Sequence, residues 1–228
     1  MSISKPSLAE GRDARSLSVL VSRRATDPCG MLAVGQELVS LIKGEARFLA
    51  QKTVEVSLPE GGKRMITGDR VFLDLGSRSK IPDIPGLAAA KPMTHVEALD
   101  LQRLPEHVIV LGGGYVGLEL AQALRRFGAA VTMIERSGQV AAAEDPDVAQ
   151  EILEDFASEG IEVLLNTRTR EVKGLSGQNV RVIVENNHSQ QTIEGTDLLI
   201  ATGRTPNTHG IGLEAAGIDL DVRAGTSK

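Results

Sequence analysis

The chain has 228 residues, which is enough for one large or two small domains. Hydrophobic residues make up 41% of it and charged residues 24%, as in ordinary soluble proteins, whereas aromatic residues are only 2%, so the core must be built from aliphatic side chains. The net charge of −5 gives no electrostatic reason to expect nucleic acid or an anionic membrane as a partner, and no apolar run approaches the ~20 residues of a membrane span.

The first part of the chain, residues 1–30, is mostly polar and is predicted to be weakly structured. Its apolar patch, Leu17–Val21, is followed by Ser22-Arg23-Arg24 and not by a glycine-rich phosphate loop. No continuous apolar stretch of the secretory-signal kind is present, and Cys29 is the only cysteine, which excludes an internal disulfide. We therefore expect a cytoplasmic protein.

Residues 31–76 predict a helix followed by short strands. Met31–Lys43 has apolar residues at helical spacing and ends before Gly44, a possible C-cap. The strand-like runs that follow are Ala46–Ala50, Thr53–Leu58, Arg64–Thr67 and Arg70–Leu75. The prolines of residues 81–86 push the preceding residues out of the helical region and predict an extended linker.

The stretch 107–135 has the full context of a dinucleotide-binding fingerprint. The apolar strand Val108–Leu111 leads into glycines, a segment of helical period follows, and a second apolar strand, Val131–Ile134, ends in Glu135. The glycines of the G-x-G-x-x-G pattern are Gly112, Gly114 and Gly117, with Gly113 between the first two. A glycine-rich turn without a ligand is the alternative.

Each residue of the fingerprint has a physical task. Gly112 permits a tight turn, Gly114 lets the backbone approach a diphosphate, and Gly117 lets the helix pack closely. The amides at the start of the helix favour phosphate. Glu135 is placed to accept hydrogen bonds from the ribose hydroxyls, or else is a solvated charge. Its carboxylate would repel a 2′-phosphate and so favours NAD over NADP, although the neighbouring Arg136 could offset this.

A further helix, strand and meander follow. Asp145 as N-cap and Pro146 at the first position predict a helix that stops at Gly160, and Ile161–Leu165 predicts a third strand. A three-stranded antiparallel meander then replaces a crossover helix, and Leu198–Ala201 returns to the parallel sheet. The meander strands are Arg168–Val172, Val180–Glu185 and Gln191–Ile193. The predicted fold class is α/β, with a Rossmann-like NAD(P)-binding domain.

A weak internal repeat relates residues 64–76 to residues 191–203. In both, a short strand and a turn precede an apolar run that closes on glycine, Gly76 in the first copy and Gly203 in the second. The fingerprint glycine Gly112 lies 91 residues before Gly203, and the same distance before Gly76 falls ahead of Met1. The first copy therefore resembles the tail of another nucleotide-binding domain without its phosphate loop.

The chain resembles the pyridine nucleotide-disulfide oxidoreductases, the flavoproteins that include glutathione reductase, lipoamide dehydrogenase and mercuric reductase. The matching stretches span about residues 31–220. They are GEARF at 44–48, VFLDLG at 71–76, IPG at 84–86, HVIVLGGGYVGLELAQALRRFG at 107–128, DLLIATGRTPNT at 197–208 and GLE at 212–214. The mercuric-reductase-like branch is the most similar.

This resemblance implies cofactors and site residues. In the family, NAD(P)H reduces FAD, and FAD reduces a cysteine pair. Tyr115 resembles the aromatic residue that gates the nicotinamide pocket, and Glu119 resembles the acid beside the nicotinamide; a residue covering the loop and an exposed helix residue are the respective alternatives. The implied cofactor-binding set is Gly76, Gly112, Gly113, Gly114, Tyr115, Val116, Gly117, Glu119, Glu135, Arg136, Thr202, Gly203 and Arg204. No catalytic residue and no metal ligand is assigned.

Several family features are absent from this sequence. These are the first glycine motif, which binds the ADP half of FAD, the C-x-x-x-x-C redox pair, the later Gly-Asp flavin block, and the interface domain with its His-x-x-x-x-Glu pair. Cys29 has no partner cysteine, and Leu75 replaces the usual threonine before Gly76. The sequence is therefore expected to be an internal piece of such an enzyme. The family is homodimeric, but the interface domain is missing here.

The resemblance implies an FAD-dependent NAD(P)H oxidoreductase, in which this chain supplies the NAD(P)H-binding domain. The alternative is a catalytically incomplete fragment that only binds NAD(H) or is inert. The expected domains are a partial FAD-type domain (31–100), the NAD(P)-binding domain (101–202) and a return segment to the FAD-type domain (203–228). Pyridine nucleotide is the expected partner. Cys29 and the four histidines have no metal-ligand or catalytic spacing, so structural roles are expected.

Overall fold

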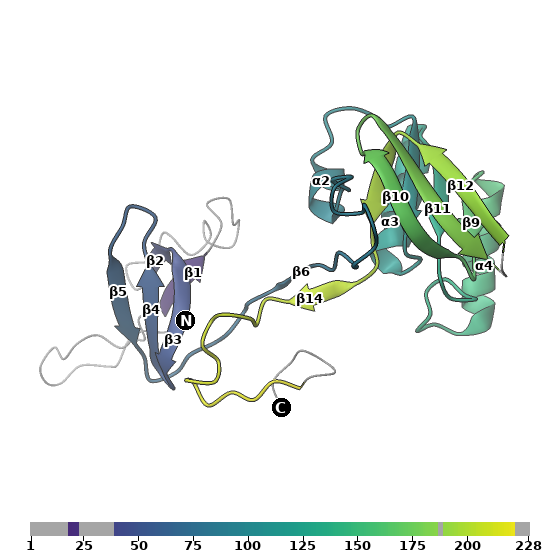
Figure 1. Cartoon of the computed structure of the whole chain (residues 1–228). Coiled ribbons are helices and arrows are strands. Elements are labelled where there is room, and N and C mark those ends of the chain that lie inside the picture. The colour runs from purple at the N-terminus through teal and green to yellow at the C-terminus, as the bar shows by residue number, and fades with distance from the viewer. Residues whose placement is uncertain (1–17, 23–38, 187–188, 222–228) are drawn as a thin grey trace, which may run out of the picture. The chain divides into compact units, whose positions relative to one another are not determined.

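The computed structural model describes residues 18–22, 39–186 and 189–221. The chain divides into two compact units, one formed by residues 1–77 and 206–228 and the other by residues 78–205 (Figure 1). It passes from one unit to the other twice, at the short strands β6 (Ser77–Ser79) and β14 (Arg204–Pro206), which pair with each other. Below, residues 1–77 and 206–228 are called unit 1, and residues 78–205 are called unit 2.

Unit 2 is built on a four-stranded parallel sheet in the order β13-β7-β8-β9. The strands are β7 (His107–Leu111), β8 (Ala130–Ile134), β9 (Glu162–Leu164) and β13 (Asp197–Ile200). Val108 to Leu111 are at most 2% exposed, so both faces of β7 are covered. Such continuous apolar runs are typical of central parallel strands.

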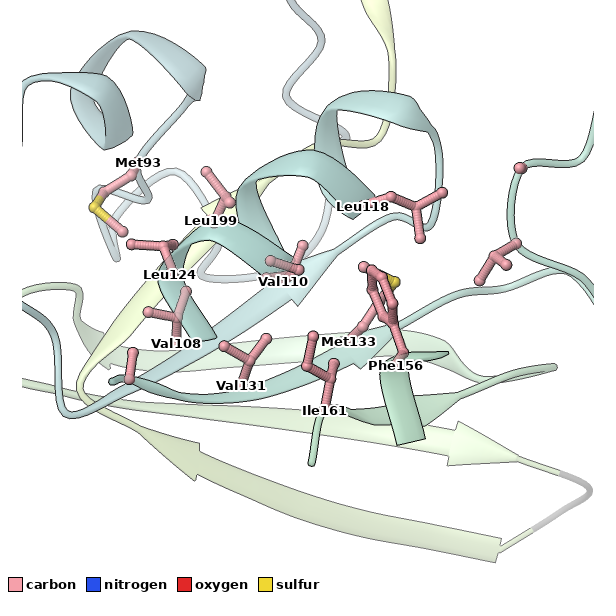
Figure 2. Packing of buried hydrophobic residues seen from close by; sticks show 14 of the residues in the cluster. Met93, Val108, Val110, Leu118, Leu124, Val131, Met133, Phe156, Ile161 and Leu199 are labelled. Atoms are coloured by element: carbon pink, nitrogen blue, oxygen red, sulfur yellow. The ribbon is translucent and has the colours of Figure 1, made fainter. Parts of the chain in front are cut away.

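Helices cover one face of this sheet. They are α3 (Tyr115–Phe127) and α4 (Pro146–Ser158), and their apolar sides share a buried cluster with alternate residues of β7 and β8. Figure 2 shows Leu118 and Leu124 of α3 and Phe156 of α4 in this cluster, beside Val110 and Met133. Helix α4 begins after Asp145 with Pro146 in its first turn, as the sequence predicts.

The antiparallel meander covers the opposite face. Its strands are β10 (Arg168–Leu175), β11 (Asn179–Asn186) and β12 (Ser189–Gly195), in that order. The alternate residues Val180, Val182 and Val184 of β11 are 0% exposed and pack against Ile109, Leu111 and Ile134 of the parallel sheet. The predicted meander in place of a crossover helix is thereby confirmed.

Residues 78–100 belong to unit 2, whereas we expected the division near residue 100. Leu87 and Ala90 are buried against the meander side of the sheet, and Met93 is buried on the helix side. The Met93 backbone also forms two hydrogen bonds with β13. Its amide donates to the Leu198 carbonyl and its carbonyl accepts from the Ile200 amide, each at 2.8 Å. The short helix α2 (His95–Leu99) follows, with a capping box made by Thr94 and Glu97.

Unit 1 contains a parallel pair and an antiparallel sheet. The pair joins β1 (Ser18–Ser22) and β2 (Val39–Lys43), and the three-stranded sheet consists of β3 (Glu45–Ala50), β4 (Thr53–Ser57) and β5 (Lys63–Thr67). Their buried cluster includes Phe48, Val54 and Val56, together with Leu213 and Ala216 from near the end of the described chain.

Two local predictions in this unit are wrong, and a third concerns a segment of which only Ser18–Ser22 is described. Residues 39–43 form strand β2 and not the end of a helix, because they pair with β1. Strand β1 lies in the segment predicted to be weakly structured; the rest of that segment, residues 31–38 and Cys29 lie outside the described residues. Residues 70–76 form no strand, although Arg70–Leu75 has a strand pattern.

In the described part of the chain, no helix has both the length and the apolar character that crossing a membrane requires.

Candidate dinucleotide site

Of the three fingerprint glycines, Gly112 and Gly114 lie in the turn between β7 and α3, and Gly117 lies in the first turn of α3. Gly112 has a φ of +106°, in the left-handed region that favours glycine, and a Cβ there would lie 2.5 Å from the Ala201 carbonyl oxygen. A Cβ on Gly117 would lie 2.1 Å from the Gly112 carbonyl oxygen. The tight turn and the close packing of helix on strand expected from these glycines are therefore present.

Gly114 differs from its neighbours because a Cβ there would meet no atom within 4 Å. It is the N-cap of α3, its own conformation is extended, and, as a glycine, it makes no side-chain capping bond to this end of the helix. The first amides of α3 lie next to it, and a helix start combines free N–H groups with the positive end of the helix dipole. This turn therefore has open space where a bound diphosphate would need it.

Glu135 follows directly on the end of β8 and supports the glycine turn. One carboxylate oxygen accepts a hydrogen bond from the Gly113 amide and the other from the Ser137 amide, each at 2.7 Å. A carboxylate has about four acceptor positions, so each oxygen can still accept another hydrogen bond. Glu135 is half-buried, and the adjacent Arg136 is exposed. The support of the turn by Glu135 was not expected from the sequence.

Residues 136–145 form the loop between β8 and α4, and this loop also touches the turn. The Ala141 amide donates to the Gly113 carbonyl at 2.8 Å, and Val140 is 0% exposed. The Glu144 carboxylate accepts a hydrogen bond from the Tyr115 hydroxyl. Sequence reasoning missed Ala141 and Glu144; no local pattern marks them, because their role depends on the folded path of the loop.

The remaining predicted residues fall into three groups. Val116 is half-buried and Glu119 exposed on the first two turns of α3. Thr202, Gly203 and Arg204 follow β13, whose end lies against Gly112. Gly76 belongs to unit 1, with φ +61°, and accepts a hydrogen bond from the Asn207 amide at 3.1 Å. The structure thus brings the residues of unit 2 to one edge of the parallel sheet.

His95 has a more specific environment than the sequence suggests. Its Nδ1 lies 3.1 Å from the Ser79 hydroxyl, and its Nε2 lies 3.3 Å from a guanidinium nitrogen of Arg204. The ring therefore contacts the last residue of β6, Ser79, and the first residue of β14, Arg204. Among the described residues, no three His, Cys, Asp or Glu side chains gather as metal ligands would.

A family model, the pyridine nucleotide-disulphide oxidoreductases, matches residues 4–227. The chain belongs to this family. The sequence-based assignment is therefore confirmed, and so is the predicted α/β class with a Rossmann-like sheet and part of a second domain.

Curated relatives and solved structures agree with this membership. The mercuric reductases of Acidithiobacillus ferrooxidans and Streptomyces lividans are 36% and 37% identical to this chain, over 83% and 80% of its length. The HOCl-induced flavoprotein disulfide reductase RclA of Escherichia coli, solved as a Cu(II) complex, is 31% identical with a TM-score of 0.74 over 84% of this chain.

The chain spans only part of each relative. It covers 34% and 38% of the two mercuric reductases and 42% of the RclA chain. Activity of the whole enzymes is therefore a separate question from membership of the family.

Proposed function

We propose that this chain supplies the NAD(P)H-binding domain of a flavin-dependent oxidoreductase. The glycine turn would hold the diphosphate of the nucleotide through the first amides of α3, and Glu135 would accept hydrogen bonds from the adenosine ribose. We favour NAD(H), because the carboxylate of Glu135 would repel a 2′-phosphate. The proposal depends on one observation above all: the open, uncapped start of α3 beside a carboxylate with spare acceptor positions.

The residues present fit NAD(H) on two grounds. The space beside Gly114 is free of protein atoms to 4 Å, so the backbone can be approached closely. The Gly113 amide is already bonded to Glu135, which leaves the amides after it for a ligand. Arg136 is exposed next to Glu135 and would be the group to accommodate a 2′-phosphate if NADPH also binds.

The sequence offers fewer residues for binding FAD than for binding NAD(H). The sequence contains a single G-x-G-x-x-G pattern, the one at Gly112, so no second turn of this type is available for the diphosphate of FAD. Only Gly76 and the Gly203–Arg204 segment resemble flavin-side residues of the family. In the complete enzyme a hydride would pass from NAD(P)H to FAD, chemistry that belongs to the cofactors. We assign this chain the binding and orientation of the nucleotide.

A second candidate is a chain that binds NAD(H) without turnover. Its support is the lone Cys29, because thiol exchange in the family needs two cysteines. The two candidates share the same binding site and differ in catalysis, so one purified protein can distinguish them.

The experiment is a fluorescence titration of NADH with the wild-type chain and with Gly114→Ala. The added methyl group meets no protein atom within 4 Å, so the fold should survive while approach of the diphosphate is blocked. We expect affinity for NADH in the wild type and its loss in the variant. Equal binding by both would refute this site, and absence of binding by the wild type would refute the proposed function.

Two further measurements refine the proposal. Titration with NADPH should show weaker binding than NADH, and Glu135→Gln should narrow the difference by removing the charge. The visible absorbance of the purified chain reports bound flavin. Stoichiometric flavin with steady NADH oxidation would overturn the non-catalytic candidate.

A further inference from the structure

The glycine turn is held from two sides by hydrogen bonds. On one side the Gly112 amide donates to the Ile134 carbonyl at 2.9 Å, and the Gly113 amide donates to Glu135 at 2.7 Å. On the other side the Gly113 carbonyl accepts from the Ala141 amide at 2.8 Å. The second side belongs to the loop 136–145, which therefore takes part in fixing the turn.

This loop has a defined shape of its own. Val140 is fully buried, and its Cγ1 lies 3.0 Å from the position a Cβ on Gly113 would take. Ala141 adopts a left-handed φ of +45°. The Glu144 amide donates to the Ala141 carbonyl at 2.8 Å, and the Gln139 side chain donates to the Glu144 carbonyl at 2.9 Å. The position of Glu144 is thus set by the folded loop.

Tyr115 is the first residue of α3, next to the amides at the open end of the helix. Its hydroxyl donates a hydrogen bond to Glu144, and 57% of the residue is exposed. Packing alone therefore fixes this side chain weakly, and the bond to Glu144 is what ties it to the loop. Loop 136–145 therefore forms hydrogen bonds with the turn at Gly113 and with the first residue of α3, Tyr115.

We propose that Glu144 is a positioning residue for the nucleotide site. Through the Tyr115 hydroxyl it holds the first turn of α3 against loop 136–145, so that the amides of residues 114–116 are already oriented before a diphosphate arrives. A site that is ordered in advance loses less conformational entropy on binding and binds more tightly. The ligand side of this inference rests on the proposed function.

The bond itself can be followed without any ligand. Tyr115 is the only tyrosine, and the sequence has no tryptophan, so the ultraviolet absorbance change on phenol ionisation reports this residue alone. The hydrogen bond to Glu144, reinforced by burial and by the nearby negative charge, raises the pKa of Tyr115 above its ordinary value. Glu144→Ala should return the pKa to the ordinary range, whereas Glu151→Ala, at an exposed position on α4, should leave it unchanged.

The effect on binding is measured by a double-mutant cycle with NADH. Tyr115→Phe and Glu144→Ala should each weaken binding by about three- to tenfold, and the double variant should be no weaker than either single one, because one bond is lost in all three. Circular dichroism should show the same fold throughout. Glu151→Ala again serves as the matched control.

The outcomes are distinguishable. The inference would be overturned if the wild type binds NADH and the single variants bind it equally well or more tightly. It would also be overturned if the losses of affinity in the two single variants add up in the double variant. In either case the proposed function would stand. An unchanged Tyr115 titration in Glu144→Ala would also overturn the inference, because the bond would not exist in solution. Failure of the wild type to bind NADH would refute the proposed function and, with it, the role of Glu144 in binding.

Discussion

The two copies of the internal repeat have the same sequence pattern and different structures. Residues 197–200 form the strand β13, in which every residue is at most 1% exposed. Residues 71–75 form no strand, and Phe72 and Leu73 are 69% and 40% exposed. The difference lies in the neighbours. Strand β13 pairs with β7 on one edge and exchanges hydrogen bonds with Met93 on the other.

The first copy has fewer contacts of this kind. Val71 and Leu75 reach the buried cluster of unit 1, and the Leu75 carbonyl accepts a hydrogen bond from the Asn207 side chain at 3.0 Å. The second copy pairs with β7, the strand that leads into the fingerprint glycines; the sequence has no such glycine pattern for the first copy. An apolar run therefore becomes a strand only where the fold provides another strand to pair with.

The largest difference in stability between the two copies should appear when a charge is placed at the matching position of each. Leu199→Asp buries a carboxylate at a position that is 0% exposed, and we expect a loss of more than about 4 kcal/mol in the free energy of unfolding of unit 2. Phe72→Asp should change stability by no more than about 0.5 kcal/mol, because the side chain is already exposed. Urea denaturation followed by circular dichroism measures both, and comparable losses would show that Phe72 is buried in solution.

A smaller loss is expected at the start of the repeat. Asp197 is 1% exposed and pairs with Arg103 at 2.7 Å, whereas Asp69, the aspartate just before the apolar run of the first copy, is exposed. The other Asp197 oxygen has no hydrogen-bond partner among the described residues, so the carboxylate depends on Arg103. Arg103→Met should cost about 3 kcal/mol by leaving a buried charge unpaired.

Asp69→Ala is the control for this pair, and its unfolding midpoint in urea should match that of the wild type. A midpoint for Arg103→Met that also equals the wild-type value would mean that water reaches Asp197.

The next effect concerns the glycine turn, whose Gly112 lies beside Ala201 of the second copy. Gly117→Ala would place a methyl group 2.1 Å from the Gly112 carbonyl oxygen, so helix α3 must shift away from β7, at a cost of about 1–3 kcal/mol. Gly76→Ala meets no atom closer than 3.9 Å and should cost about 1 kcal/mol, from its left-handed backbone alone. Thermal unfolding of both variants tests this order, and the reverse order would contradict the packing described here.

The smallest effect is a pH dependence confined to unit 2. Arg126 bonds to Glu159 across α3 and α4, and this bond lowers the pKa of Glu159. A carboxyl group with a lowered pKa in the folded state stabilises the fold above its pKa in the unfolded chain, near ~4.3, and the stabilisation is lost as the pH falls through the lower folded value. The melting temperature should therefore fall less steeply on acidification in Glu159→Gln than in the wild type. Identical pH profiles would show that the pair is screened by solvent.

The structure bears out much that the sequence predicted about local order. Strands β3, β4, β5, β7 and β8, helix α4 and the meander lie at or within a few residues of their expected positions. Each has an apolar period or a turn signal within its own residues, such as the alternating valines of β11 or Pro146 at the start of α4. The failures, residues 39–43 and 70–75, are short apolar runs whose state depends on a partner elsewhere in the chain.

For the candidate site, the sequence by itself determined the glycine turn, the acid after the second strand and membership of the family, because these are fixed spacings along one chain. Only the tertiary structure decided that Glu135 holds the Gly113 amide, that Ala141 holds its carbonyl, and that Glu144 meets Tyr115. The physical reason is that a hydrogen bond between residues tens of positions apart depends on the folded path of the loops, and no local residue pattern encodes that path.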